Sequence, residues 1–387
     1  MKKIYFTWMV IIFLFSITSS AQNYTTVEPA DAPADGKTHG MIIHQENGQD
    51  VTYELEDLQH VTYLPEVGMK VYLKNATTSV DYLYRNIVSI DYAQDSNNNA
   101  NWEAFGRTDY PEAWRLEYPH LSDNVSPNAD STKSQIIVKR TDNYGITFSL
   151  EWDNALVANR WTCYELHAGN SLSSVNRNDD FKADPEVAVS PTLDDYRASG
   201  YSRGHLCPSA DRQCSVEQNK QTFYMTNMQP QYSSHNSGLW NRLEMLVRDY
   251  ATNDDYTALH CDTMYIVKAA TITNKVNING TEVDGIYPER CIGNEHHTHE
   301  LIVPKYFYMA LLHYNKATDS YHAIAFWTEH KDENQPVKNL ADYAISIQEL
   351  QERTGIDFFC NLPDWIEETV EAQEPDLTFW KKITRTE

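Results

Sequence analysis

The segment from Tyr201 to Arg248 constrains the fold more than any other part of this chain, because strand-like and helix-like patterns follow one another there. Apolar residues recur at steps of three and four between Leu239 and Tyr250, which predicts an amphipathic helix with one buried stripe. Before it, residues 221–228 are rich in Thr, Phe, Tyr and Met, a composition typical of a strand. The segment therefore predicts a strand and a helix that pack on a common core.

Polar and charged residues accompany these two elements at regular positions. Asn227 lies near the end of the predicted strand, and Asn236 opens the predicted helix. At roughly 100° per residue, Asn236, Trp240, Glu244 and Arg248 form a row that borders the apolar stripe. The candidate site residues of the whole segment are Arg203, His205, Asn227, Asn236, Glu244 and Arg248.

These residue types suit the cleavage of a phosphodiester. Because a phosphodiester is an anion, its hydrolysis needs a base for the water, a metal to absorb charge on the leaving oxygen, and cations to hold the phosphates. His205 offers the base and Asn236 a hard oxygen ligand for a metal. Arg203 and Arg248 offer the cations.

Three ordered motifs in this region read YSRGHL, TNMQPQ and HNSGLWNRLE, over Tyr201–Leu206, Thr226–Gln231 and His235–Glu244. Together they resemble the DNA/RNA non-specific endonuclease family, which uses a ββα-metal finger. A weaker likeness extends from residue 102 to residue 371, and the first hundred residues lie outside it. Any one motif arises by chance, whereas three at matching spacing form a specific signal.

The resemblance implies a role for each candidate residue. His205 takes a proton from the attacking water, and Asn236 is the only direct protein ligand to a hydrated magnesium ion, with manganese or another divalent cation as alternatives. Glu244 holds a metal-bound water, and Asn227 supports the histidine loop or the substrate. Arg203 and Arg248 contact phosphate. Because neutral imidazole is the active form, the rate is expected to fall below a pH near 6.5.

The chain departs from the family pattern at Ser202, where an aspartate usually precedes the arginine. Serine offers only a weaker, neutral hydrogen bond, so we expect lowered activity. One alternative is therefore a catalytically weak or inactive nuclease-fold protein that binds a partner at its surface. Another is a phosphodiesterase or phosphatase that acts on small substrates.

Each candidate residue also has a purely structural interpretation. Glu244 and Arg248 are four residues apart and could form a surface ion pair. Asn236 could serve as a helix cap and nothing more. His205 is one of fourteen histidines, most of which must be structural. The dense group His296, His297, His299 and Glu300 could bind a transition metal, but a loop that enters the following apolar strand is the favoured interpretation.

Charge limits the kind of nucleic-acid protein that this can be. The chain has 31 basic and 55 acidic residues, for a net charge of −24, whereas tight nucleic-acid binders are usually basic. That balance disfavours a sequence-specific regulator more than a hydrolase that releases its products. We expect a local positive cleft, formed by Arg203, Arg212, Arg242 and Arg248.

The pattern along the chain predicts several parts. Residues 1–21 contain two lysines and an apolar run before small residues, which indicates a signal peptide. Short alternating segments in 25–94 predict a small β-rich domain, whose role the sequence does not indicate. The polar stretch 95–101 predicts a linker. Residues 102–387 are predicted to form the endonuclease-like domain, with a strand over 263–270 and a helix over 340–353 that Gly355 would cap. The predicted class is α+β, a ββα-metal endonuclease core on an antiparallel sheet with flanking helices, preceded by the small β-domain.

The signal peptide and the cysteines predict an exported protein, either periplasmic or extracellular. Six cysteines lie after residue 21, an even number that suits disulfide bonds, with the pairing left open. Cys207 and Cys214 flank the loop just after His205 and could brace it. No later run is long and apolar enough to cross a bilayer, so we expect no stable membrane insertion. The family resemblance implies DNA and RNA as substrates. The sequence leaves the oligomeric state open.

Overall fold

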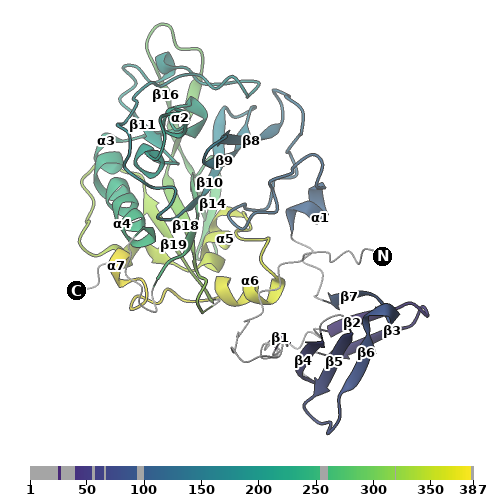
Figure 1. The fold of residues 1–387 in the computed structure, drawn as a ribbon. Helices are drawn as coiled ribbons and strands as arrows, with labels where there is room; N and C mark the ends of the chain where they lie inside the picture. The colour runs from purple at the N-terminus through teal and green to yellow at the C-terminus, as the bar shows by residue number, and fades with distance from the viewer. Residues whose placement is uncertain are drawn as a thin grey trace. The chain divides into compact units, whose positions relative to one another are not determined.

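The computed structural model describes residues 25–27, 40–54, 57–64, 67–93, 100–252, 260–318 and 320–384. The chain divides into two compact units (Figure 1): residues 1–97 together with Pro363–Trp365, and residues 98–362 together with 366–387. The second unit holds most of the chain and all of the candidate site residues. The predicted signal peptide lies outside the described residues, and so do positions 95–99 of the predicted linker.

The first unit is built from antiparallel strands in two small sheets. One has the order β1-β4-β5-β6 and the other the order β3-β2-β7. Alternate residues such as Met41 and Ile43, or Met69 and Val71, point into one shared core, as the period of a half-buried strand requires. The strands are β1 (Thr25–Val27), β2 (Gly40–Gln45), β3 (Asp50–Glu54), β4 (Leu58–Leu64), β5 (Gly68–Leu73), β6 (Val80–Leu83) and β7 (Ile87–Ala93).

A seven-stranded antiparallel sheet forms the centre of the second unit, in the order β20-β19-β18-β13-β10-β9-β8. Its long central strands carry apolar residues on both faces, which predicts a sheet covered on both sides. Strand β13, for example, coincides with the predicted strand 263–270. The strands are β8 (Ser134–Thr141), β9 (Gly145–Asp153), β10 (Ala158–Leu166), β13 (Thr263–Ala270), β18 (Tyr306–Asn315), β19 (Ser320–Glu329) and β20 (Ala344–Ile345).

Each face of this sheet has its own core. On β18, Phe307 and Met309 belong to the core that α4 (Asn241–Ala251) covers, whereas Tyr308 and Ala310 belong to the core under α5 (Ile347–Thr354). Figure 1 shows the two helices on either side of the sheet. The other helices are α1 (Asn101–Phe105), α2 (Val216–Gln221), α3 (Ser233–His235), α6 (Asp364–Glu371) and α7 (Lys381–Thr384).

Three small hairpin-like sheets complete the unit. The pair that matters for the site is β11 and β12, which leads through α3 into α4 and so forms a ββα arrangement. The predicted α+β class is therefore confirmed. The pairs are β11 (Ser202–His205) with β12 (Met228–Gln231), β14 (Lys275–Ile278) with β15 (Thr281–Asp284), and β16 (Ile286–Ile292) with β17 (Glu300–Pro304).

Two predicted elements differ from the structure. The strand predicted over 221–228 begins only at Met228, because α2 ends at Gln221 and a 3-10 turn occupies Met225–Asn227. The helix predicted over 340–353 is a 3-10 turn, a short strand and then α5, which Ser346 caps and Gly355 ends in the left-handed conformation. In both places, apolar residues are buried in irregular segments, so their pattern predicted a regular element that the structure does not have.

The prediction of disulfide bonds is wrong. All six cysteines are free and buried, and burial raises the pKa of each thiol. Cys207 and Cys214 do not bridge the loop after His205, because the Cys214 thiol instead donates a hydrogen bond to Gln218 Oε1 at 2.7 Å. The cysteines act as small apolar core residues.

Candidate active site

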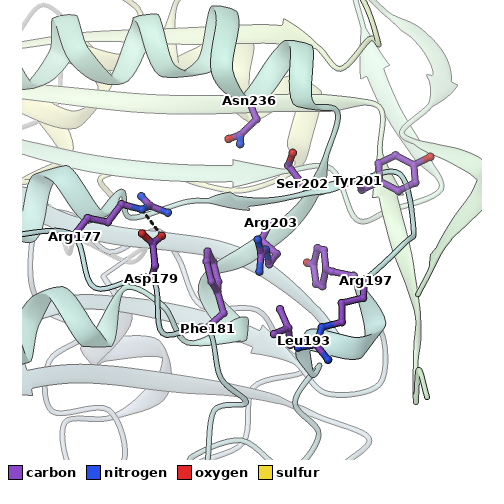
Figure 2. Close-up of a pocket in the computed structure, with 10 residues that line it drawn as sticks. Arg177, Asp179, Phe181, Leu193, Arg197, Tyr201, Ser202, Arg203 and Asn236 are labelled. Atoms are coloured by element: carbon purple, nitrogen blue, oxygen red, sulfur yellow. Dashed lines mark hydrogen bonds and ion pairs between the residues drawn. The ribbon is translucent and has the colours of Figure 1, made fainter. Parts of the chain in front are cut away.

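A cavity of about 570 Å³ lies where β11 and the start of the α3–α4 segment come together. Figure 2 shows Asn236 and Ser202 next to each other on one side and Phe181 with Arg203 below them. Three arginines and one aspartate make its charged lining net positive. The lining residues are Arg177, Asp179, Phe181, Leu193, Tyr196, Arg197, Tyr201, Ser202, Arg203 and Asn236.

Asn236 reaches this cavity from a distorted turn and not from a regular helix. Residues Asn236–Trp240 form a π-helical turn between α3 and α4, with non-helical angles at Gly238. Single π-turns inside helices are frequent at functional sites. In the part of the chain that the structure describes, no side chain donates to the Asn236 carboxamide oxygen, so this oxygen is available to a ligand.

The close contact of β11 and β12 depends on Gly204. A Cβ atom at Gly204 would lie 2.0 Å from Oε1 and 2.9 Å from Cβ of Gln231. The Gln231 amide nitrogen is in turn 2.6 Å from Nδ1 of His235, the residue before Asn236. The glycine of the Arg-Gly-His motif thus allows the contact that anchors the turn carrying Asn236.

Arg203 and His205 lie on the same face of β11, and both contact Phe181. The Arg203 guanidinium carbon is 4.0 Å from the centre of the Phe181 ring, and the His205 ring is 5.6 Å from it. Burial lowers the pKa of Arg203, and the charge of Asp179 partly offsets this effect. Arg203 therefore presents a partly desolvated cation to the cavity.

His205 lies behind Phe181 and is absent from the cavity lining. Its side chain is 9% exposed, and Phe223 covers it as well, at 5.1 Å between ring centres. Nε2 is buried without a hydrogen-bond partner among the described residues. Burial, followed by the charges of Arg177, Arg203 and Lys268, lowers the pKa of His205 to about 3.

Asn227 holds the backbone after His205 and does not reach the cavity. Its carboxamide oxygen accepts from the Cys207 N–H at 2.9 Å, and its nitrogen donates to the carbonyls of Cys207 at 2.8 Å and Thr222 at 2.9 Å. The side chain is fully buried. Of the two roles expected for Asn227, the geometry favours support of the histidine loop.

Glu244 and Arg248 do not pair with each other. Lys268 Nζ lies 3.1 Å from Glu244 Oε1, and Arg248 Nε lies 2.5 Å from Asp211 Oδ1. Burial raises the pKa of Glu244, and Lys268 opposes that shift. Both residues therefore belong to a buried charged network with Lys268 and Asp211, and neither of them lines the cavity.

The structure thus brings together only part of the predicted site. Ser202, Arg203 and Asn236 share the cavity, whereas Arg212 is fully buried and donates to backbone carbonyls. The expected positive cleft is formed instead by Arg203 with Arg177 and Arg197. Those two arginines lie in irregular segments without periodicity, so their sequence carried no signal of their position.

The histidine-rich group is structural. Residues 293–299 form the loop before β17, as predicted, and Asp195 accepts the backbone N–H groups of Thr298 and His299 at 2.5 and 2.8 Å. Asp195 also accepts from Thr192 N–H at 2.7 Å. The loop therefore braces the 3-10 turn Leu193–Asp195, which lines one wall of the cavity.

Comparison with known proteins decides what this arrangement is. The model of the DNA/RNA non-specific endonuclease family matches residues 130–365, which include the cavity, the ββα segment and the buried network. The chain belongs to this family. The family resemblance inferred from the three motifs is therefore confirmed, and the candidate active site lies inside the family domain.

Curated relatives of this family are nucleases at modest identity. A mitochondrial nuclease EXOG from Xenopus laevis is 27% identical over 56% of this chain and 58% of its own length. A mitochondrial nuclease from Saccharomyces cerevisiae is 28% identical over 54% and 63%. A nuclease from Nostoc sp. is 26% identical over 60% and 79%. The chain thus spans less than two thirds of the length of the frog and yeast family members.

A solved structure, the complex of EndoG with EndoGI, is also similar to this chain. The match has a TM-score of 0.47 and 22% identity, and covers 58% of this chain and 86% of that one.

The prediction of an exported, periplasmic or extracellular protein is corrected by the family comparison. The frog and yeast relatives are named as mitochondrial nucleases. These names contradict the prediction of an exported protein. The prediction rested on the composition of residues 1–21 and on disulfides that do not form. None of the helices in the described ranges is long and apolar enough to cross a membrane.

Proposed function

We propose that this protein is a divalent-metal-dependent endonuclease that hydrolyses the phosphodiester bonds of DNA and RNA without strong sequence preference. One observation carries the proposal: a neutral oxygen ligand, Asn236, and a partly desolvated cation, Arg203, line the same cavity inside the family domain. Guanidinium groups hold phosphates and read no bases, which supports low sequence preference.

The residues fit a hydrated divalent cation, with magnesium as the proposed metal and manganese or another divalent cation as alternatives. Asn236 offers one hard oxygen, and one or two protein ligands suffice for Mg²⁺ because the ion keeps several of its waters. When bound, the ion would neutralise charge on the leaving oxygen. Glu244 is the proposed acceptor for a metal-bound water, since only its Oε1 is occupied in the described structure.

His205 is the proposed general base. Its low pKa keeps the imidazole neutral near pH 7, which is the form that accepts a proton from water. Because Nε2 is covered, the Phe181 ring must shift before water can reach it. Phe181 lies on the exposed segment that follows Asp179, a residue with a positive φ of 59°.

The arginines of the cavity are the proposed phosphate clamps. Arg203 is assigned this role from the family resemblance. Arg177 and Arg197 are assigned it because they line the same cavity. Arg248 is engaged by Asp211, so we assign it an indirect role that keeps α4 in place beside the cavity. We further propose that residues 102–387 carry the activity and that 25–94 form a separate domain.

Two observations favour the alternative of a catalytically weak or inactive nuclease-fold protein. The imidazole that should act as base is buried among aromatic rings, and Ser202 replaces the aspartate of the family motif. Such a protein would keep the cavity and bind nucleic acid or another anionic partner without cutting it.

Incubation of the purified full-length protein with plasmid and with RNA separates the two proposals. We expect cutting of both with Mg²⁺, none with a chelator, and none by His205→Ala. His296→Ala is the control, because that histidine is exposed and outside the cavity. No cutting by the wild type across several divalent metals would establish the inactive alternative.

A further inference from the structure

A fully buried lysine lies under the candidate site. Lys268 is on β13, in the middle of the seven-stranded sheet, and its side chain is on the face that carries Met264, Ile266 and Ala270. That face is covered by α4. A lysine is almost never fully buried unless its charge is paired, so its partner identifies its role.

The partner of Lys268 is Glu244. The ammonium lies 3.1 Å from Glu244 Oε1 and within 6 Å of the ring centres of Trp240 and Tyr164, at 5.9 and 5.8 Å. Trp240 is the last residue of the π-turn that begins at Asn236. Lys268 thus contacts both the end of that turn and the carboxylate that follows it by one helical turn.

We propose that Lys268 is a positioning residue that fixes the Glu244 carboxylate for a metal-bound water. Its hydrogen bond holds Oε1, while no side chain in the described ranges donates to Oε2, which leaves this oxygen free for the water. The proposal rests on the proposed function, in which Asn236 holds the ion. Lys268 itself touches neither the ion nor the substrate.

A stabilising role alone does not account for this pair. Desolvation of a buried ion pair often cancels its Coulombic gain, and apolar residues of similar volume are then as stable or more stable. The same face of β13 is otherwise apolar, so a methionine would fill the space of Lys268. The charge of Lys268 also lowers the pKa of Asp211, but its one ion pair among the described residues is with Glu244, so we place its role there.

The test is a binding titration of Mn²⁺, followed by electron paramagnetic resonance, on full-length variants. Lys268→Met keeps the volume without the charge, and we expect about tenfold weaker Mn²⁺ binding, as is usual when the partner of a ligand is lost. Glu244→Gln should weaken binding to a similar degree. The double variant should bind no more weakly than Glu244→Gln alone, because Lys268 acts through Glu244.

The matched control is Lys139→Met. Lys139 is also a buried lysine in ion pairs, 2.7 Å from Asp184 and 2.8 Å from Glu186, and it is outside the cavity lining. The Lys139→Met variant should lose stability, measured by thermal unfolding, without a change in Mn²⁺ affinity. Lys268→Arg, which keeps the donor and the charge, should recover part of the affinity.

Three outcomes would overturn the proposal: unchanged Mn²⁺ affinity in Lys268→Met, losses that multiply in the double variant, or no Mn²⁺ binding by the wild type. If the wild type binds Mn²⁺ but cuts neither DNA nor RNA, the proposed function fails, while the coupling of Lys268 to Glu244 can still be read from the binding data.

Discussion

At the scale of single residues, the chemistry is controlled by what covers each side chain. His205 has the identity expected of a base, but Phe181 and Phe223 keep water from it, and burial lowers its pKa to about 3. The pKa expected from the motif alone is near 6.5, because burial by rings that are distant in sequence cannot be read from the motif. The structure therefore changes the expected pH dependence.

This change can be measured. If His205 is the base, kcat/KM of the wild type should not fall between pH 7 and about 5 on account of this residue, since it stays neutral there. Phe181→Ala admits water to the imidazole and should raise its pKa toward about 6.5. The acid limb of its profile should then appear within that range. An acid limb near pH 6.5 in the wild type would refute the effect of burial.

Asn227 shows how a buried amide supports the site without touching it. Asn227→Ala removes three hydrogen bonds to backbone groups of Cys207 and Thr222 and leaves those groups unpaired. We expect the free energy of unfolding to fall by roughly 2–4 kcal/mol and the activity to fall with the order of the histidine loop. Urea unfolding measures the first effect. A loss of less than about 0.5 kcal/mol, the size of an ordinary surface effect, would contradict this role.

At the scale of elements, sequence periodicity predicted the long, regular pieces and missed the irregular ones. The apolar stripe of α4 is buried as predicted, and β13 has the predicted bounds. The π-turn at Asn236–Trp240 was missed, because one residue added to a helix barely disturbs a pattern with a period of 3.6. Trp240 is consequently a core residue, although the row of polar positions placed it at the border.

The predicted site was limited by the same physical cause. Arg203 and Asn236, both singled out by the family motifs, line one cavity because both lie on the ββα segment itself. Phe181, Arg177 and Arg197 come from loops whose paths depend on tertiary contacts, such as the packing of Phe181 on Phe223. Lys268 was missed because a charged residue within an apolar strand pattern gives no hint of its partner.

At the scale of the whole molecule, buried titratable groups set the response of stability to acid. Burial lowers the pKa of His205 and His235 to about 3 and that of His330 to about 4. These histidines stay neutral when folded but take up protons when unfolded. Their contribution to stability is therefore present above about pH 6.5 and is lost as the pH falls toward the folded values.

Two buried carboxyl groups act in the opposite direction. Burial raises the pKa of Glu117 to about 7 and that of Glu371 to about 8. Their stabilising effect grows as the pH falls from about 8 and is complete below the unfolded value near 4.5. Between about pH 6.5 and 4.5 the two groups of residues partly cancel.

We therefore expect the steepest loss of stability between about pH 4.5 and 3, where the histidine effect continues and the lowered pKa values of Asp195 and Asp211 begin to add to it. Urea unfolding at closely spaced pH values measures it. A free energy of unfolding that stays constant through this window would show that the three histidines are not buried in the neutral form.

The central claim is that the cavity shared by Asn236 and Arg203 is where a divalent metal supports cleavage. The most direct measurement is the rate of plasmid cleavage by the wild type and by Asn236→Ala as Mg²⁺ is increased. The account predicts that the variant loses most of its activity at low Mg²⁺ and recovers part of it at high Mg²⁺, because the proposed direct ligand is gone. A variant with the Mg²⁺ dependence and rate of the wild type would contradict the account.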